Sequence, residues 1–555
     1  MVTILIMLAV IFMAAACSSG TTKTTQPAGE TMLALQAVPA PGETLEQSAA
    51  GQPVSPARSI ALERTLADML GNPGSITYRG SAAGWSVPTD ISAAAVYRDR
   101  GYRPIWVSGD GRFTPQGVLL IDRLVDARMD AMDPAAYRTE TIRNAMAQGD
   151  VVGLAAAELM LSEALVWYSA DLWDRKDKDF SLLERAAAAE DFGAFLRELA
   201  PTDLDYARLR DALAKYNAIV MVGGWETIPA GGTLRSGASD SRVPALRRRL
   251  AFSGDLPEDA DTEAAIFDGE LEEAVKRFQA RHGLAQDGVI GARSLKVLNV
   301  SAEVRAEQLA GNLRLQRKPE SRFGDRAIVV NVAAYELVMF DGGKEVLRSR
   351  TIVGLPDWET PRLVSELKWL EINPTWSVPR RIAVEEIMPR LRRDGTDYLD
   401  KRGFRLFDMN WQELDSEEVD LASIKGDVLP FILRQDPGPR NPLGNVKFNF
   451  PNGESIYLHD TPSRRLFNRA NRAISHGCVR VEAAAKLAMS LLREEGWTQA
   501  DYDKVLKSGK TYRVKLHNPM PIYIVTRTAW VEADNSVQFR NDPYEEGKSL
   551  QLALN

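Results

Sequence analysis

The sequence predicts a multidomain α+β protein in which helical regions precede a β-rich C-terminal region. Its 555 residues are enough for three or four domains with sizeable cores. Apolar residues recur at helical spacing over most of residues 60–233, whereas strand and hairpin signals dominate after residue 324. No internal repeat of solenoid length is present. The helical and β-rich parts are therefore expected to fold as separate units.

The first 16 residues predict export. Val2–Ala16 is almost wholly apolar and short for a membrane span, and small residues precede Cys17. We interpret residues 1–16 as a signal peptide. Small residues directly before a cysteine resemble the lipobox of bacterial lipoproteins, which implies that Cys17 is lipidated and, because Ser18 follows it, that the protein lies at the outer membrane. The alternative is an ordinary cleaved signal peptide and a soluble periplasmic protein.

Residues 17–58 are predicted to form a flexible tether. They are rich in Ser, Thr, Pro, Gly and Ala and contain few large apolar residues. About 40 residues of coil have a typical reach of roughly 35 Å. A lipid anchor at Cys17 would thus let the folded part work at a distance from the membrane.

Residues 59–241, together with residues 302–323, are predicted to form a helical domain. Thr114-Pro115 is a helix start, and apolar residues follow it at helical spacing as far as Val125. A second run, Ala155–Leu172, is interpreted as an amphipathic helix. No group of catalytic residue types occurs in this region.

A compact helical insert is predicted over residues 242–301. Leu271, Ala274, Val275 and Phe278 share one helix face, and Gly283 can end that helix. Tight turns at Asp287-Gly288 and Gly291 precede a second helix that ends at Leu298. The acidic run Asp255–Asp261 is interpreted as a solvated loop.

Residues 324–545 are predicted to be β-rich. Ala327–Val332 and Tyr335–Phe340 have strand character, Asp341-Gly342-Gly343 is a hairpin turn, and Lys344–Val353 returns. Helical and polar segments interrupt the strands over about residues 382–428.

The β-rich region also contains the candidate site. Cys478 lies in the run Ser475–Arg480, which also contains one of the chain's four histidines, and His459 ends an alternating, strand-like segment. Residues 482–493 have helical spacing, so Cys478 is expected just before a helix N-terminus, whose dipole favours thiolate. A histidine that can act as base near a cysteine indicates a cysteine nucleophile. The amides of Gly477 and Cys478 are candidates for an oxyanion hole.

The remaining composition argues against other classes of site. His282 and His517 lie outside this group and are interpreted as surface or structural residues. No Cys-x-x-Cys or His-Glu-x-x-His pattern occurs, so no metal and no cofactor are expected. The net charge of −7 and the absence of a basic–aromatic stripe argue against a nucleic-acid partner.

The runs Tyr457–Pro462 and Ser475–Arg480 resemble the active site of the L,D-transpeptidases of bacterial cell walls. Asn373–Pro379 and Arg434–Phe448 are similar to segments of the large periplasmic, scaffold-containing members of that family. The resemblance covers about residues 325–544 and implies that Cys478 is the nucleophile and His459 its general base. It further implies that the backbone carbonyl of Asp460 orients the imidazole. His476 and Gly477 would position the substrate or stabilise the oxyanion. The residues that would bind the substrate or support the site are Arg480, Ser475, Tyr457 and Trp376.

The other regions resemble parts of the same large proteins. Trp106–Gly109 and Asp133–Tyr137 are similar to pieces of their helical scaffold. Phe278-Gln279, Gly283-Leu284 and Leu298-Asn299 resemble the small three-helix peptidoglycan-binding domain. The implied architecture is a β-rich L,D-transpeptidase catalytic domain with a helical cap at about residues 382–428, preceded by an α-helical scaffold domain and the peptidoglycan-binding domain.

The resemblance implies a two-step acyl transfer by a monomer acting on peptidoglycan stem peptides in the sacculus. Cys478 would release the terminal D-Ala of a tetrapeptide as it forms a thioester, and an amine of a neighbouring stem would then form a cross-link between third-position diamino acids. Water as acceptor would give an L,D-carboxypeptidase or endopeptidase, and a protein lysine would give a lipoprotein-to-peptidoglycan ligase. A non-catalytic wall-binding scaffold protein is the alternative from another class.

Overall fold

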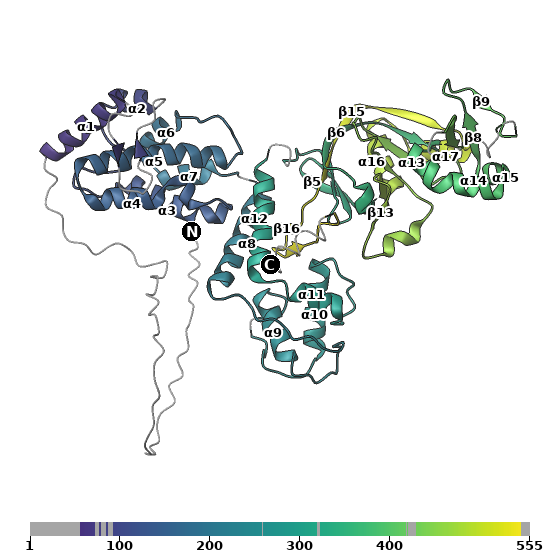
Figure 1. Ribbon diagram of the computed structural model, residues 1–555, viewed down its shortest axis with the longest axis horizontal. Coiled ribbons are helices and arrows are strands. Elements are labelled where there is room, and N and C mark those ends of the chain that lie inside the picture. Colours follow the sequence, from purple (N-terminus) through teal and green to yellow (C-terminus); the bar gives the residue numbers. More distant parts are fainter. Residues whose placement is uncertain are drawn as a thin grey trace, which may run out of the picture. The chain divides into compact units, whose positions relative to one another are not determined.

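The computed structural model describes residues 56–72, 77–78, 85–86, 93–201, 203–257, 259–318, 322–417, 419, 424 and 429–544 (Figure 1). The predicted signal peptide, Cys17 and the tether as far as residue 55 lie outside the described residues. Helices fill the N-terminal half and strands dominate the C-terminal half. The chain is therefore a multidomain α+β protein, as the sequence predicts.

The first helical region surrounds one long helix, α5 (Val151–Asp171). α1 (Pro56–Gly71), α3 (Pro115–Val125) and α4 (Thr139–Gln148) contact it. Thr114 caps α3 as predicted, because its hydroxyl accepts a hydrogen bond from the Gly117 amide. The other elements of this region are β1 (Thr77–Tyr78), β2 (Trp85–Ser86), α2 (Ala93–Asp99), η1 (Asp126–Asp130), η2 (Pro134–Tyr137), α6 (Leu182–Ala188) and α7 (Phe192–Leu199).

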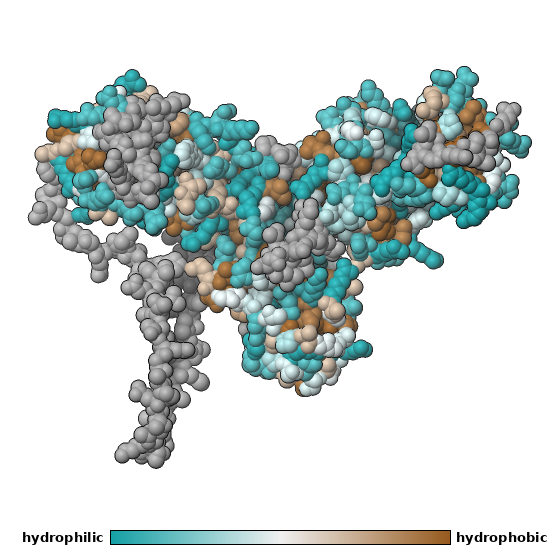
Figure 2. Space-filling model, in the orientation of Figure 1, coloured by the Kyte–Doolittle hydropathy of each residue, from teal (hydrophilic) through white to brown (hydrophobic). Residues whose placement is uncertain are grey.

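The interpretation of residues 155–172 as an amphipathic helix is wrong. α5 buries residues on nearly every side. Within the described part of the chain it is the one helix long and apolar enough to span a membrane by length and composition, and 78% of its most apolar window is buried inside the protein. Figure 2 shows a mostly hydrophilic visible surface over this region. α5 is thus the central helix of a packed core.

Glu158 of α5 fixes the loop that precedes α3. Its buried carboxylate accepts hydrogen bonds from the amides of Ile105, Trp106 and Val107 at 2.6, 2.8 and 3.0 Å, and from the Tyr97 hydroxyl at 2.6 Å. Burial raises the pKa of Glu158 to about 7, and these hydrogen bonds oppose the shift. The Trp106–Gly109 run is therefore a packing feature of the helical core.

A helix pair carries the insert and also receives the C-terminal hairpin. α8 (Leu204–Met221) packs on α12 (Ala302–Arg317), and β16 (Ala529–Val531) and β17 (Val537–Phe539) pack onto both helices. The side chain of Phe539 is completely buried there. The insert between α8 and α12 contains α9 (Val243–Phe252), α10 (Gly269–Arg281) and α11 (Ala292–Leu298), close to the predicted helices.

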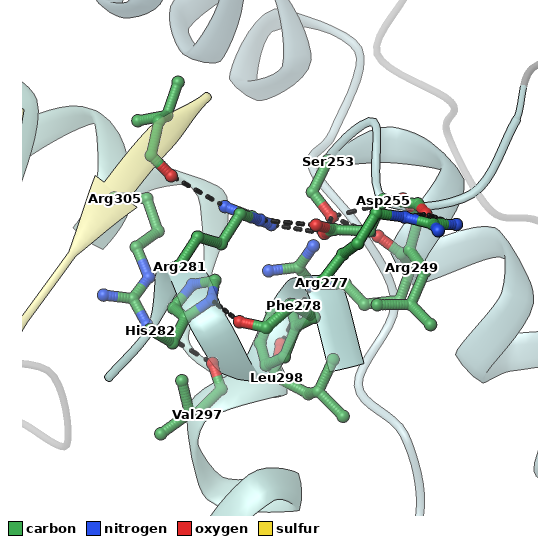
Figure 3. A network of polar contacts seen from close by, with 12 residues as sticks. Arg249, Ser253, Asp255, Arg277, Phe278, Arg281, His282, Val297, Leu298 and Arg305 are labelled. Carbon is green, nitrogen blue, oxygen red and sulfur yellow. Dashed lines mark hydrogen bonds and ion pairs between the residues drawn. The ribbon is translucent and has the colours of Figure 1, made fainter. Parts of the chain in front are cut away.

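The interpretation of residues 255–261 as a solvated loop is wrong for Asp255. Its carboxylate is buried and forms a bidentate ion pair with Arg281 of α10, with N···O distances of 2.6 and 2.5 Å (Figure 3). Arg281 also donates to the Val537 carbonyl, and His282 stacks between the rings of Phe278 and Phe539. This network fastens the C-terminal hairpin to the insert and makes His282 structural.

The C-terminal region is built on a nine-stranded sheet of order β13-β5-β14-β12-β11-β6-β15-β3-β4. β4 also pairs with β5, so the strands from β5 to β4 close into a ring. α16 (Ala484–Glu494) packs against the sheet core, and α17 (Gln499–Ser508) follows. The strands are β3 (Ala327–Asn331), β4 (Glu336–Asp341), β5 (Lys344–Gly354), β6 (Leu363–Ile372), β11 (Val446–Asn449), β12 (Leu458–His459), β13 (Ala473–Ser475), β14 (Val479–Val481) and β15 (Tyr512–Val525).

The segment between β6 and β11 forms a subdomain with its own core, which we call the cap. Its helical part is α13 (Arg380–Ile382), the π-helix η5 (Ala383–Ile387), α14 (Met388–Asp394) and α15 (Asp397–Arg402). A small sheet of order β7-β10-β8-β9 completes it, with β7 (Trp376–Ser377), β8 (Phe404–Phe407), β9 (Glu413–Leu414) and β10 (Ile432–Gln435). The cap is thus mixed rather than purely helical, because β8 and β9 lie inside residues 382–428 and β8 pairs with β10, which follows that range.

Candidate active site

Cys478 lies in the tight connection between β13 and β14. The expectation that it directly precedes a helix is wrong, because β14 follows it at once and α16 begins only at Ala484. A helix dipole acts over about one turn, so α16 is too far along the chain to be the main influence on the thiol. Cys478 is half-buried, and its sulfur lies 3.9 Å from the Ser455 carbonyl oxygen.

The connection before Cys478 is held by side-chain hydrogen bonds to its carbonyls. The Ser475 hydroxyl donates to the Cys478 carbonyl at 2.7 Å, and the Thr360 hydroxyl donates to the Gly477 carbonyl at 2.6 Å. Gly477 has a φ of +99°, which a residue with a Cβ rarely adopts. In the described part of the chain the amides of Gly477 and Cys478 donate to no protein acceptor. Two free N–H groups therefore lie beside the sulfur.

His459 is held in the sheet next to Cys478. β12 pairs with β14 in parallel and with β11 in antiparallel register, so His459 lies between Lys447 and Arg480 on one face. The imidazole is only 5% exposed, and its Nδ1 lies 2.5 Å from the Asp460 carbonyl oxygen. Among the described contacts no hydrogen bond joins His459 directly to Cys478.

Burial keeps His459 neutral. Desolvation, followed by the nearby charges of Arg480 and Lys447, lowers the pKa of His459 to about 3, although the carbonyls of Asp460 and Pro442 hydrogen-bond the ring. A neutral imidazole that donates through Nδ1 carries its lone pair on Nε2. The Asp460 carboxylate instead accepts from the Asn445 amide and pairs with Arg464. Asp460 thus touches the imidazole through its backbone.

The thiol is also neutral at rest. Burial raises the pKa of Cys478, opposed by hydrogen bonds from the Tyr457 amide and hydroxyl and by the charges of Lys447 and Arg480. Burial thus acts against the thiolate that a helix N-terminus beside Cys478 would have favoured. The Tyr457 hydroxyl stays protonated, because burial raises its pKa well above the usual value, and its side chain also hydrogen-bonds Trp376.

Lys447 is a residue of the site that the sequence patterns did not single out. Its ammonium lies 4.1 Å from the centre of the Tyr457 ring, which is the ring that contacts the thiol. No carboxylate forms an ion pair with Lys447 or Arg480 within the described residues. Side chains alternate along β11, so Val446 and Phe448 lie in the core and Lys447 lies on the opposite face. That Lys447 is next to His459 follows only from the pairing of β11 with β12, which the sequence does not reveal.

His476 contacts the cap. Its Nε2 lies 2.6 Å from the Glu386 carboxylate of η5, and its ring meets the Trp358 ring edge to face at 4.8 Å. No sequence pattern pointed to Glu386, because the contact joins segments far apart in the chain. His517 pairs with Glu495 at the surface, away from this site. In the described ranges no group of three or more His, Cys, Asp or Glu side chains could hold a metal ion.

A cavity of about 1030 Å³ borders the site without containing the sulfur. Asp460, Arg464, Glu482 and Lys486 are among its lining residues, and Cys478 is not. The chemistry therefore centres on the Cys478 connection, and the cavity lies next to the residue that orients His459.

Three parts of the chain match known families. Residues 325–497 match the L,D-transpeptidase catalytic domain and residues 92–179 match a scaffold domain. Residues 239–298 match a family described as "Putative peptidoglycan binding domain". A Haemophilus influenzae protein named "Putative L,D-transpeptidase" is 38% identical over 248 residues, which cover 44% of this chain and 49% of that protein. The chain thus spans about half the length of the curated relative it matches.

The solved structures to which this chain is similar include two L,D-transpeptidases. The one from Mycobacterium smegmatis is 12% identical, with 36% of this chain and 59% of that chain covered. The one from Stackebrandtia nassauensis is 16% identical, with 54% of this chain and 96% of that chain covered. The TM-scores are 0.17 and 0.20, so these similarities carry no argument.

Proposed function

Because the chain carries an L,D-transpeptidase catalytic domain beside a peptidoglycan-binding domain, we propose that it cross-links peptidoglycan stem peptides through a thioester on Cys478. The observation that carries this proposal is the placement of Cys478, His459 and two free amides at one connection of the sheet. The donor is a tetrapeptide stem, and the product joins the third-position diamino acids of two stems.

The first step acylates Cys478. His459 is neutral and therefore able to take the thiol proton as sulfur attacks the carbonyl carbon of the third residue. Catalytic hydrogen bonds often tighten only when substrate is bound, which fits the absence of a direct Cys478–His459 bond here. The proton then passes to the departing D-Ala nitrogen as the C–N bond breaks.

The developing oxyanion lies next to the amides of Gly477 and Cys478. Their N–H groups have no protein acceptor among the described contacts, so they are free to donate to it. Lys447 and Arg480 supply two cations on the His459 side that form no ion pair among the described residues, although the charges of Glu371 and Glu386 act on them. The planar guanidinium of Arg480 suits a substrate carboxylate. We assign Ser475 to holding the connection, and Tyr457 and Trp376 to binding substrate beside the thiol.

The second step transfers the acyl group to an amine. The cap contacts His476 through Glu386 and would limit the access of water to the thioester. Water as the acceptor would make the protein a carboxypeptidase, and a protein lysine would make it a ligase. The match over residues 239–298 supports binding to the sacculus.

We further propose a periplasmic location, with a lipid anchor on Cys17. Mass spectrometry of the mature N-terminus tests the anchor. A triacylated Cys17 is expected, since stable anchoring needs more than one chain. An unmodified N-terminal peptide that begins elsewhere would leave a soluble periplasmic protein.

Incubation of the purified protein with disaccharide-tetrapeptides tests the reaction. The expected products are free D-Ala and a dimer whose fragment masses place the new bond between third-position residues. Release of D-Ala with tripeptide alone would assign water as the acceptor. No release of D-Ala at any protein concentration would favour the non-catalytic scaffold.

A further inference from the structure

The two sides of Cys478 differ in charge. Lys447 and Arg480 lie on the side of His459, in register across β11, β12 and β14. On the side of His476 the cap contributes a carboxylate, Glu386, whose charge also acts on Arg480 but which forms its close contact with His476. The stem that donates the acyl group loses a residue with a carboxylate, whereas the stem that accepts it brings an ammonium. Charge complementarity therefore assigns the leaving D-Ala of the donor stem to the side of Lys447 and Arg480, and the amine of the acceptor stem to the side of Glu386.

Glu386 is placed to meet a ligand. One carboxylate oxygen, Oε1, lies 2.6 Å from His476 Nε2. The other, Oε2, has no hydrogen-bond or ion-pair partner within the part of the chain that the structure describes, although the carboxylate feels the charge of Arg480. The side chains of Glu386 and His476 keep 40% and 28% of their surface exposed, so both can be reached from solvent.

The backbone that carries Glu386 is held independently of its carboxylate. The Arg381 guanidinium stacks on Trp358 at 3.8 Å from the ring centre and pairs with Glu385 at 2.8 Å. Trp358 in turn contacts the His476 ring. Glu386 itself lies in a π-helix, a rare geometry that often occurs at functional sites. Removing the Glu386 charge should therefore leave η5 in place.

We propose that Glu386 determines the acceptor specificity of the transfer step, by binding the ammonium of the incoming stem between its free oxygen and His476. This inference rests on the proposed function. The carboxylate raises the local concentration of an amine over water at the thioester, and it holds the His476 ring through Nε2. Glu386 thus favours cross-linking over hydrolysis.

The chemistry of this step balances without a further reactant. The bound ammonium first loses one proton to solvent through the Glu386–His476 pair. The neutral nitrogen then attacks the thioester carbonyl carbon, so that the new C–N bond forms and the C–S bond breaks. The second proton lost by nitrogen passes to the Cys478 sulfur and restores the thiol.

The test compares Glu386→Gln with Glu385→Gln in the full chain. Both changes neutralise a carboxylate of the same π-helix, but Glu385 pairs with Arg381 and not with His476. The Arg381–Glu385 pair is exposed and therefore weak, and the stacking of Arg381 on Trp358 still holds the backbone when it is lost. The rate of covalent capture of a carbapenem by Cys478, measured by intact mass, reports acylation. The ratio of dimer to tripeptide formed from disaccharide-tetrapeptide reports the choice of acceptor.

Glu386→Gln is expected to lower the ratio of dimer to tripeptide about tenfold, as loss of one charged hydrogen bond implies, with carbapenem capture within about threefold of wild type. Glu385→Gln should match wild type in both, and Glu386→Asp, which keeps the charge, should recover most of the dimer. An unchanged ratio in Glu386→Gln, or an equal loss of capture and dimer in a folded Glu386→Gln protein, would overturn the inference. Wild-type protein that releases no D-Ala would overturn the proposed function as well.

Discussion

At the scale of single residues, the site contains a neutral thiol and a neutral imidazole rather than a thiolate–imidazolium ion pair. Burial raises the pKa of Cys478 and lowers that of His459, and Lys447 partly offsets the first shift. Lys447→Met should therefore raise the thiol pKa further and move the pH profile of Cys478 alkylation to higher pH, since a cation that favours thiolate is lost. Iodoacetamide labelling followed by intact mass across a pH series measures this. Lys486→Met, the same change at an exposed position of α16, is the control. A profile that stays in place or moves to lower pH in Lys447→Met would contradict the role of Lys447.

Sequence patterns located the chemistry but not its surroundings. Cys478 and His459 stand out because the residue types themselves carry the reactivity and lie near each other in the chain. Lys447 and Glu386 become part of the site only through strand register and through the folding of the cap against His476. The same limit explains the error at Asp255, because its partner Arg281 lies on another helix and a charged run looks solvated without it. The dipole argument for Cys478 failed because a three-residue strand is too short to disturb helical periodicity.

At the scale of elements, α5 depends on the one carboxylate in its buried interior. At a pH well above 7, where Glu158 with its pKa of about 7 is ionised, Glu158→Gln should destabilise the helical region by about 2 kcal/mol. The reason is that three amides lose a charged acceptor and face an amide that can accept through only one atom. Thermal unfolding by circular dichroism should show a midpoint roughly 4–8 °C lower. Glu184→Gln, on the short helix α6, is the control and should change little. An unchanged midpoint for Glu158→Gln would mean that Glu158 is protonated in the folded protein.

At the scale of the whole molecule, the insert and the catalytic sheet have separable tasks joined by the C-terminal hairpin. Deleting residues 242–301 with a short bridging linker should weaken sedimentation with purified sacculi and leave carbapenem labelling of Cys478 largely unchanged. The deletion also removes His282 from the Phe539 ring, so Phe539→Ala in the full chain controls for a loosened hairpin and should keep sacculus binding. Equal sedimentation of the deletion protein and wild type would refute a binding role for the insert.

The central claim is that Cys478 carries the acyl group, and trapping that intermediate tests it most directly. Wild-type protein mixed with disaccharide-tetrapeptide and quenched in acid should gain the mass of the substrate minus D-Ala, and peptide mapping should place the adduct on Cys478. Cys478→Ala should remain folded, gain no mass and form no dimer, because a methyl group replaces the sulfur beside His459. An adduct at any other residue, or dimer formation by folded Cys478→Ala protein, would contradict the account.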